Sequence, residues 1–277
     1  MEKASSIYGP VYQMILKMQN ASPDELPEMM QKLYSLNEST YTAFKSFDEE
    51  FERIRNSQAE LEEKLKELDA LLDKRMSETS AGDLAISRIS CENIYKGYWN
   101  KLDDFSQKYL TMANYLYRLF ESDDTDFSPS VLEFGRAVEN ELVSKIYSGY
   151  VASLSGNTSQ MVDSGSLYGE LKSAVRSYTT NNGEYYIPAR KMVKYLEYLS
   201  DEDLQNAYNE ALKNYLSSNG VDKIPISENT FTTMADELFY RYRNSAAHPG
   251  KTMDEPAAKT CREKSKKVLK KFMSAVS

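Results

Sequence analysis

The residues best suited to chemistry lie close together in the last part of the chain. His248 is the only histidine among 277 residues, so proton transfer near neutral pH by a side chain of ordinary pKa has to use it. Arg243 lies five positions earlier and is followed directly by Asn244. A histidine exchanges protons with hydroxyl oxygens, an arginine neutralises charge on phosphoryl oxygens, and an asparagine sets the tautomer of an imidazole. These residue types together are suited to cleaving RNA by attack of its own 2′-hydroxyl.

The helix that carries these residues has to end in the right place. On an unbroken helix, five residues turn through about 500° and rise about 7.5 Å, which leaves Arg243 and His248 on different faces. Pro249 disfavours the α conformation for the residue before it, so we expect the helix to end at or just before His248. A helix that ends at Ala247 would let the imidazole turn back toward the guanidinium. The small residues 245–247 would let another helix, or a second copy of the chain, approach closely.

This stretch resembles a known family. Arg243-Asn244-x-x-x-His248 resembles the R-x4-6-H signature of HEPN domains, whose common form has asparagine directly after arginine. Residues 131–142 look like the first long helix of these domains, which often carries acidic residues that face the active-site region. Glu139 and Glu141 are the candidates for that role, and the alternative is that both are ordinary solvated carboxylates.

The resemblance implies an activity as well as a fold. It implies a helical bundle within residues 127–277 and metal-independent cleavage of RNA, in a composite site lined by the arginines and histidines of two facing protomers. Arg243 would stabilise the transition state, His248 would do the acid and base work, and Asn244 would orient. No cofactor and no metal are implied, and the products would carry a cyclic or 3′-phosphate and a free 5′-hydroxyl. Families of this kind commonly serve in toxin–antitoxin, abortive-infection or other antiviral systems.

Two other functions stay open. In the first, the chain is a non-catalytic helical interaction or RNA-binding module, in which Arg243 and His248 are structural and bond to Glu139 or Glu141. In the second, the fold binds a nucleotide without cleaving it, although the sequence has no glycine-rich phosphate loop.

Further residues are candidates for binding RNA. Tyr240 and Tyr242 flank Arg241, and aromatic residues interleaved with arginine can stack on exposed bases. The chain has 21 tyrosines, so core packing or ordinary surface is the alternative. The last helix has a basic outer face, which includes Lys264, Lys267 and Lys271. These lysines would contact phosphates, or would complement the helix dipole near its C-terminus.

The periodicity of apolar residues predicts an all-α fold, since strand-like alternation is almost absent. The clearest pattern is a heptad seam with one polar interruption, at Gln58. Its members are Phe44, Phe47, Phe51, Ile54, Gln58, Leu61, Leu65, Leu68 and Leu72. The seam predicts either an internal helical hairpin with the stretch Leu84–Phe120, or an intermolecular coiled coil that would dimerise the protein or bind a protein partner.

A polar, acidic break at residues 121–126 predicts two parts, an N-terminal helical or coiled-coil region (1–126) and a HEPN-like helical domain (127–277). Residues 153–168 are expected to form a loop, followed by helices near 169–178, 187–199 and 201–217. A simple HEPN domain has a shorter link there, so this segment looks like an insertion.

Composition limits the classes of function. The first 126 residues hold 15 Lys and Arg against 24 Asp and Glu, and the remainder hold 19 against 18. An acidic chain is a poor general binder of nucleic acid, so any RNA contact would be a local basic patch. Two cysteines, Cys91 and Cys261, are too few for a disulfide framework, and one histidine excludes a multi-histidine metal centre, though not magnesium held by carboxylates. No apolar run is long enough to span a bilayer, so we expect a cytoplasmic protein without a membrane partner.

Overall fold

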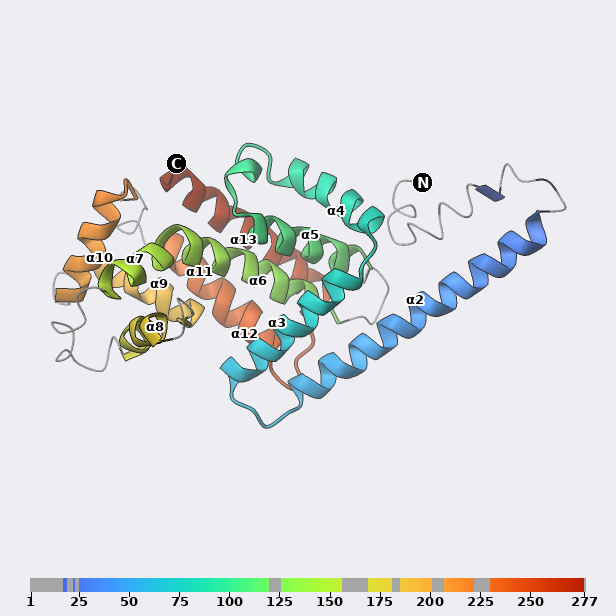
Figure 1. Ribbon diagram of the computed structural model, residues 1–277, viewed down its shortest axis with the longest axis horizontal. Coiled ribbons are helices and arrows are strands. Elements are labelled where there is room, and N and C mark those ends of the chain that lie inside the picture. The colour runs from blue at the N-terminus through green and yellow to red at the C-terminus, as the bar shows by residue number, and fades with distance from the viewer. Residues whose placement is uncertain are drawn as a thin grey trace. The chain divides into compact units, whose positions relative to one another are not determined.

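The computed structural model describes residues 17–18, 22, 25–119, 126–155, 169–180, 185–200, 207–221 and 230–276. Across these residues all regular structure is helical and there is no strand, so the protein is all-α as predicted (Figure 1). No helix in these ranges is long and apolar enough to cross a membrane.

The helices differ widely in length. The longest is α2, and the last long one is α13. The elements are α2 (Leu26–Arg55), α3 (Leu61–Glu78), α4 (Ala81–Ile94), η1 (Trp99–Lys101), α5 (Asp104–Leu119), α6 (Ser128–Leu142), η2 (Val143–Tyr147), α7 (Ser148–Ser155), α8 (Gly169–Thr180), α9 (Ala189–Glu197), η5 (Tyr198–Ser200), α10 (Ala207–Ser218), α11 (Thr230–Glu237), η7 (Leu238–Arg243), α12 (Asn244–Ala246) and α13 (Glu255–Ala275).

The chain forms two compact units that interleave along the sequence. The first unit comprises Met1–Ile94, Leu110–Glu133 and Asn244–Ala258, and the second comprises Tyr95–Tyr109, Phe134–Arg243 and Lys259–Ser277. Each unit therefore takes residues from both sides of the boundary predicted at 121–126, of which only Asp126 is among the described residues. The division into 1–126 and 127–277 stays a prediction.

In the first unit, the heptad seam is not one helix. Helix α2 ends at Arg55 and α3 begins at Leu61, so the prediction of a continuous helix across residues 44–72 is wrong. The break follows from residues 56–59, Asn-Ser-Gln-Ala, because asparagine and serine favour turns and Gln58 breaks the apolar seam. The N–H of Asn56 closes the last turn of α2 on the carbonyl of Glu52.

Beyond this break, the chain turns back and α3 lies against α2 (Figure 1). The two helices bury most of the predicted seam, namely Phe47, Phe51, Ile54, Leu65, Leu68 and Leu72. Phe44 lies outside the described side chains. The seam thus supplies its own partner helix within one chain, and an intermolecular coiled coil stays a prediction.

The stretch Leu84–Phe120 is divided as well. Helix α4 ends at Ile94 and α5 begins at Asp104, in different units, so the single long helical stretch expected there is wrong. Gly97 lies in this connection at a φ of 97°, a conformation that favours glycine and that no helix continues through. Phe120 is outside the described residues.

In the second unit, the helix leading to Arg243 departs from the expected register. The apolar spacing predicts a buried stripe of Phe231, Met234, Leu238 and Tyr242. Phe231 and Leu238 are fully buried, but Met234 and Tyr242 are only half-buried. For Tyr242 the reason is the π-helix η7, Leu238–Arg243, which continues α11. In a π turn, the residue that lies on the same face as residue i is i+5 instead of i+4. The residue that follows Leu238 into the interior is therefore Arg243 instead of Tyr242.

The helices predicted between the two halves are largely confirmed. Helices α8 and α9 with η5 cover the predicted segments 169–178 and 187–199, and α10 covers the described part of 201–217. The loop predicted at 153–168 falls mostly outside the described residues, and its first three residues belong to α7.

Candidate functional site

Arg243, the first of the candidate catalytic residues, is buried in the second unit. It is the last residue of η7, and its side chain is 3% exposed. Its Nη2 lies 2.6 Å from Oε2 of Glu139 on α6, whose side chain is 14% exposed. The predicted acidic partner on this helix is therefore present, and the contact is a buried ion pair.

Gly135 makes room for the arginine. It lies one helical turn before Glu139 on α6, so the two share a face. A Cβ added at Gly135 would stand 2.8 Å from Cδ of Arg243 and 3.0 Å from its Cβ and Cγ. The aliphatic stem of Arg243 thus lies directly on the bare backbone of α6, and its head meets the carboxylate one turn later. Gly135 was not predicted, although a glycine four positions before a glutamate in an apolar helix is a visible signal in the sequence.

Glu141, the other candidate on α6, has a different role. It is fully buried, and its Oε1 accepts the backbone N–H of Asp103 at 2.7 Å, just before the start of α5. Burial raises the pKa of Glu141, against the lowering effect of hydrogen bonds from Ser106 and from the backbone of Asp103. The neighbouring Asn140 donates to Asp103 at 2.8 Å. These contacts tie α6 to the first turn of α5, so Glu141 is a structural residue in this arrangement.

His248 and Asn244 belong to the first unit. Helix α12 ends at Ala246, and the N–H of His248 still donates to the carbonyl of Ser245 at 3.1 Å. The prediction that the helix ends just before His248 is confirmed. Asn244 is half-buried, whereas the imidazole of His248 is exposed. An exposed imidazole is accessible to an external substrate.

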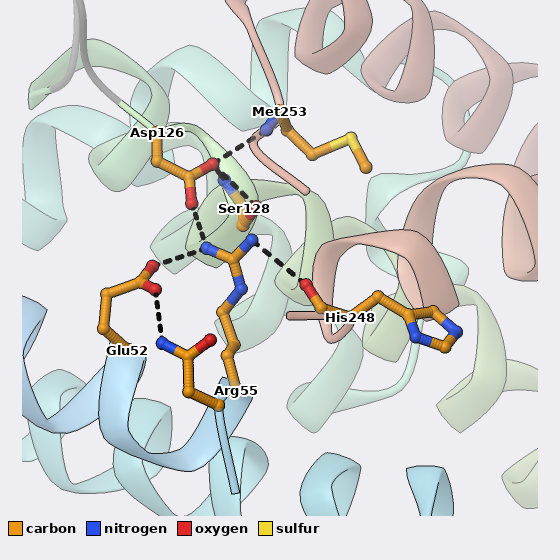
Figure 2. Close-up of polar contacts among 7 residues, drawn as sticks. Glu52, Arg55, Asp126, Ser128, His248 and Met253 are labelled. Atoms are coloured by element: carbon orange, nitrogen blue, oxygen red, sulfur yellow. Dashed lines mark hydrogen bonds and ion pairs between the residues drawn. The ribbon is translucent and has the colours of Figure 1, made fainter. Parts of the chain in front are cut away.

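The backbone of His248 is held by Arg55, the last residue of α2 (Figure 2). Nη2 of Arg55 donates to the carbonyl oxygen of His248 at 3.3 Å, and Nη1 donates to Oε1 of Glu52 at 2.6 Å and to the carboxylate of Asp126. Arg55 is 1% exposed. Figure 2 also shows the imidazole directed away from this guanidinium. The histidine thus has a fixed main chain and an accessible side chain.

Asp126, which Arg55 binds, also holds the backbone at Met253, five residues after His248. Its Oδ1 accepts the N–H of Met253 at 2.8 Å, and the N–H and hydroxyl of Ser128 at 3.0 and 2.7 Å. The N–H of Phe127 donates to the carbonyl of Met253 at 2.8 Å. Neither Arg55 nor Asp126 was predicted, because the first lies between members of the heptad seam and the second in the acidic break at residues 121–126.

The carboxylates that bind Arg55 help to raise the pKa of a further carboxyl group, that of Asp48. Partial burial and the negative charges of Asp126 and Glu52 raise the pKa of Asp48 to about 6, while Arg75 acts in the opposite direction. Asp48 therefore changes charge in the weakly acidic range, next to the groups that hold the histidine.

Two of the candidates for RNA binding on η7, Tyr240 and Arg241, have partners within the second unit. Tyr240 is 59% exposed, but the guanidinium of Arg190 lies over its ring at 4.6 Å. Arg241 is 69% exposed, with its Nη1 3.5 Å from Glu237. Burial raises the pKa of the half-buried Tyr242.

On α13, Lys264 lies 2.6 Å from the same Glu237, Lys267 is exposed and Lys271 is half-buried. Glu237 thus offsets part of the positive charge of Arg241 and Lys264. Within the described residues no cluster of three or more His, Cys, Asp or Glu side chains is arranged to hold a metal ion.

No family model, curated protein or solved structure gave a significant match to this chain. The HEPN resemblance therefore depends on the sequence motifs of this chain alone.

Proposed function

We propose that this chain is a HEPN-type endoribonuclease that cleaves RNA without a metal ion, with His248 and Arg243 as its reactive residues. The observation that supports this most is the setting of the only histidine. Its imidazole is exposed, while its carbonyl is held by a buried arginine. An accessible imidazole on a main chain that is held in place suits an acid–base catalyst.

In the proposed reaction, His248 takes the proton of the 2′-hydroxyl, the resulting oxygen attacks the adjacent phosphorus, and the bond to the 5′-oxygen breaks. The leaving 5′-oxygen needs a proton, and the products are a cyclic phosphate and a 5′-hydroxyl. One imidazole does not serve as base and acid at the same instant, so we propose that two copies face each other and share the two roles. Arg243 would stabilise the phosphoryl charge, with Glu139 holding its guanidinium, and Asn244 would orient.

A second function is favoured by a specific observation. Arg243 is 3% exposed, paired with Glu139 and packed on Gly135. A buried ion pair of this kind is equally consistent with a purely structural contact between η7 and α6. In that case the chain would be a non-catalytic helical interaction or RNA-binding module.

The test is an RNA cleavage assay with a mixed pool of structured and single-stranded RNA in EDTA. The wild type, His248→Ala and Arg243→Ala are compared, with Arg88→Ala, whose side chain is 60% exposed, as the control for loss of an exposed arginine. We expect His248→Ala to reduce the rate by about 10² to 10⁴ without changing the melting temperature, and Arg88→Ala to remain active. The 3′ ends are analysed for cyclic phosphate.

Undiminished cleavage by His248→Ala would contradict the catalytic role. Intact RNA with the wild type, together with a large loss of thermal stability in Arg243→Ala and His248→Ala, would favour the interaction module.

We further propose that the enzyme acts in the cytoplasm as a toxin or antiviral-defence effector, whose N-terminal helices bind a protein partner.

A further inference from the structure

We infer that Arg55 is a positioning residue for His248. It acts from the end of α2 on the backbone of the segment that carries the histidine, residues 247–254, which we call the histidine loop. The inference rests on the proposed function for its catalytic consequence. The mechanical part, that Arg55 holds the loop, is independent of any activity.

Burial of the Arg55 guanidinium costs free energy. A guanidinium that is 1% exposed has lost its hydration, and a loss of that kind is offset only by good partners. Arg55 has three of them, namely Glu52, Asp126 and the carbonyl of His248. Glu52 lies on the same helix, one turn earlier. The other two lie 71 and 193 positions away in the sequence, so the arginine joins three distant segments of the first unit.

The histidine loop is held at two points. Arg55 binds the carbonyl of His248, and Asp126, which Arg55 also binds, accepts the N–H of Met253 at 2.8 Å. One ion pair therefore controls both ends of a six-residue segment. Between them lie Pro249 and Gly250, the latter at a φ of 66°. Proline restricts the backbone there, and the two bonded ends restrict what the glycine leaves free.

Arg55 contacts the backbone of His248 and not its side chain. Figure 2 shows Arg55 on the carbonyl side of His248 and the imidazole on the other side. Arg55 does not touch the ring, so its effect on chemistry has to pass through the main chain. The arginine is itself well anchored, because Nζ of the buried Lys64 on α3 donates to its carbonyl at 3.0 Å. The hairpin of α2 and α3 thus sets where the histidine is presented.

The first variant for the test is Arg55→Lys, which keeps the positive charge. Lysine lacks the planar fork that bonds a carboxylate and a carbonyl at once. The control is Arg53→Lys on the same helix, whose side chain is 65% exposed. Asp126→Asn is a second variant, which keeps an oxygen acceptor for Met253 and removes the charge that Arg55 binds. Circular dichroism verifies that each variant is folded.

Two measurements report on the loop without RNA. The imidazole C–H protons of His248 give a proton NMR signal that belongs to one residue, because the chain has no other histidine. Trypsin cleavage after the exposed Lys251 reports opening of the loop. We expect Arg55→Lys and Asp126→Asn to shift or broaden the histidine signal and to speed cleavage at Lys251 about 10-fold, the effect of about 1.4 kcal/mol on a local opening equilibrium. Arg53→Lys should match the wild type.

A third measurement links the loop to catalysis. In the RNA assay, the two variants should lower kcat about 10-fold with little change in KM, since the catalytic group is displaced and RNA binding is not. Unchanged NMR and trypsin results in a folded Arg55→Lys or Asp126→Asn protein would overturn the inference. If the wild type cleaves no RNA, the proposed function fails, and the NMR and trypsin measurements still decide whether Arg55 holds the loop.

Discussion

The two units each contain an arginine that is almost fully buried at the end of a helical segment, Arg55 at 1% exposure and Arg243 at 3%. Arg243 lies against one neighbouring helix, α6, through Glu139 and the bare backbone at Gly135. Arg55 joins its own helix to two segments without regular structure, at Asp126 and His248. The same residue type at the same burial thus has two uses. In one unit it packs two helices together, and in the other it fixes a loop.

Glu139, the partner of Arg243, should contribute more to the free energy of unfolding than Glu52, the partner of Arg55. Glu139 is 14% exposed, whereas Glu52 is 49% exposed and Arg55 keeps its bond to Asp126 without it. We expect Glu139→Ala to lower the free energy of unfolding by about 3 kcal/mol and Glu52→Ala to lower it by less than about 1 kcal/mol. Urea unfolding of both variants measures this difference. Equal losses would show that the two arginines are held in equivalent ways.

Gly135→Ala tests the contact that only Arg243 has. The new methyl group would overlap the stem of Arg243, and overpacking of this kind destabilises by about 1 to 2 kcal/mol, even after the gain in helix propensity. Gly82→Ala on α4 is the matched control, since its nearest neighbour would be Oγ of Ser80 at 4.0 Å. There we expect a stabilisation of about 0.5 kcal/mol. A stabilised Gly135→Ala protein would mean that Arg243 moves aside easily.

Asp48→Asn tests the charge around Arg55. The pKa of Asp48 is raised to about 6 in the folded protein from 3.8, so the folded state binds a proton more tightly than the unfolded state. The wild type therefore loses stability as the pH rises from about 4 to about 6. The variant lacks this loss.

Since Asp48 remains exposed to solvent, we expect the variant to be more stable by less than about 1 kcal/mol at pH 7, and equal to the wild type near pH 4. Urea titrations at both pH values measure the difference. A difference that does not change with pH would contradict the assigned charge coupling.

The two contacts of Arg243, with Glu139 and with Gly135, differ in how far the sequence pattern could predict them. A pairing of Arg243 with Glu139 or Glu141 was expected only if the chain is a non-catalytic module, and Glu139 is the one that pairs with it. Spacing along a helix cannot choose between residues two positions apart until the direction of the neighbouring helix is known. Gly135 was missed for the same reason. The absence of a side chain on α6 matters only where another side chain packs over it, here that of Arg243.

The sequence by itself determined the helical class, through apolar periodicity, and the end of the helix before His248, through Pro249. Both are local properties of the backbone. The tertiary structure alone decided that Arg243 turns inward, because the π turn of η7 changes the register without any change in apolar spacing. It also decided that Arg55 holds the histidine loop, since a bond between residues 193 positions apart depends on how the chain folds back and not on its local pattern.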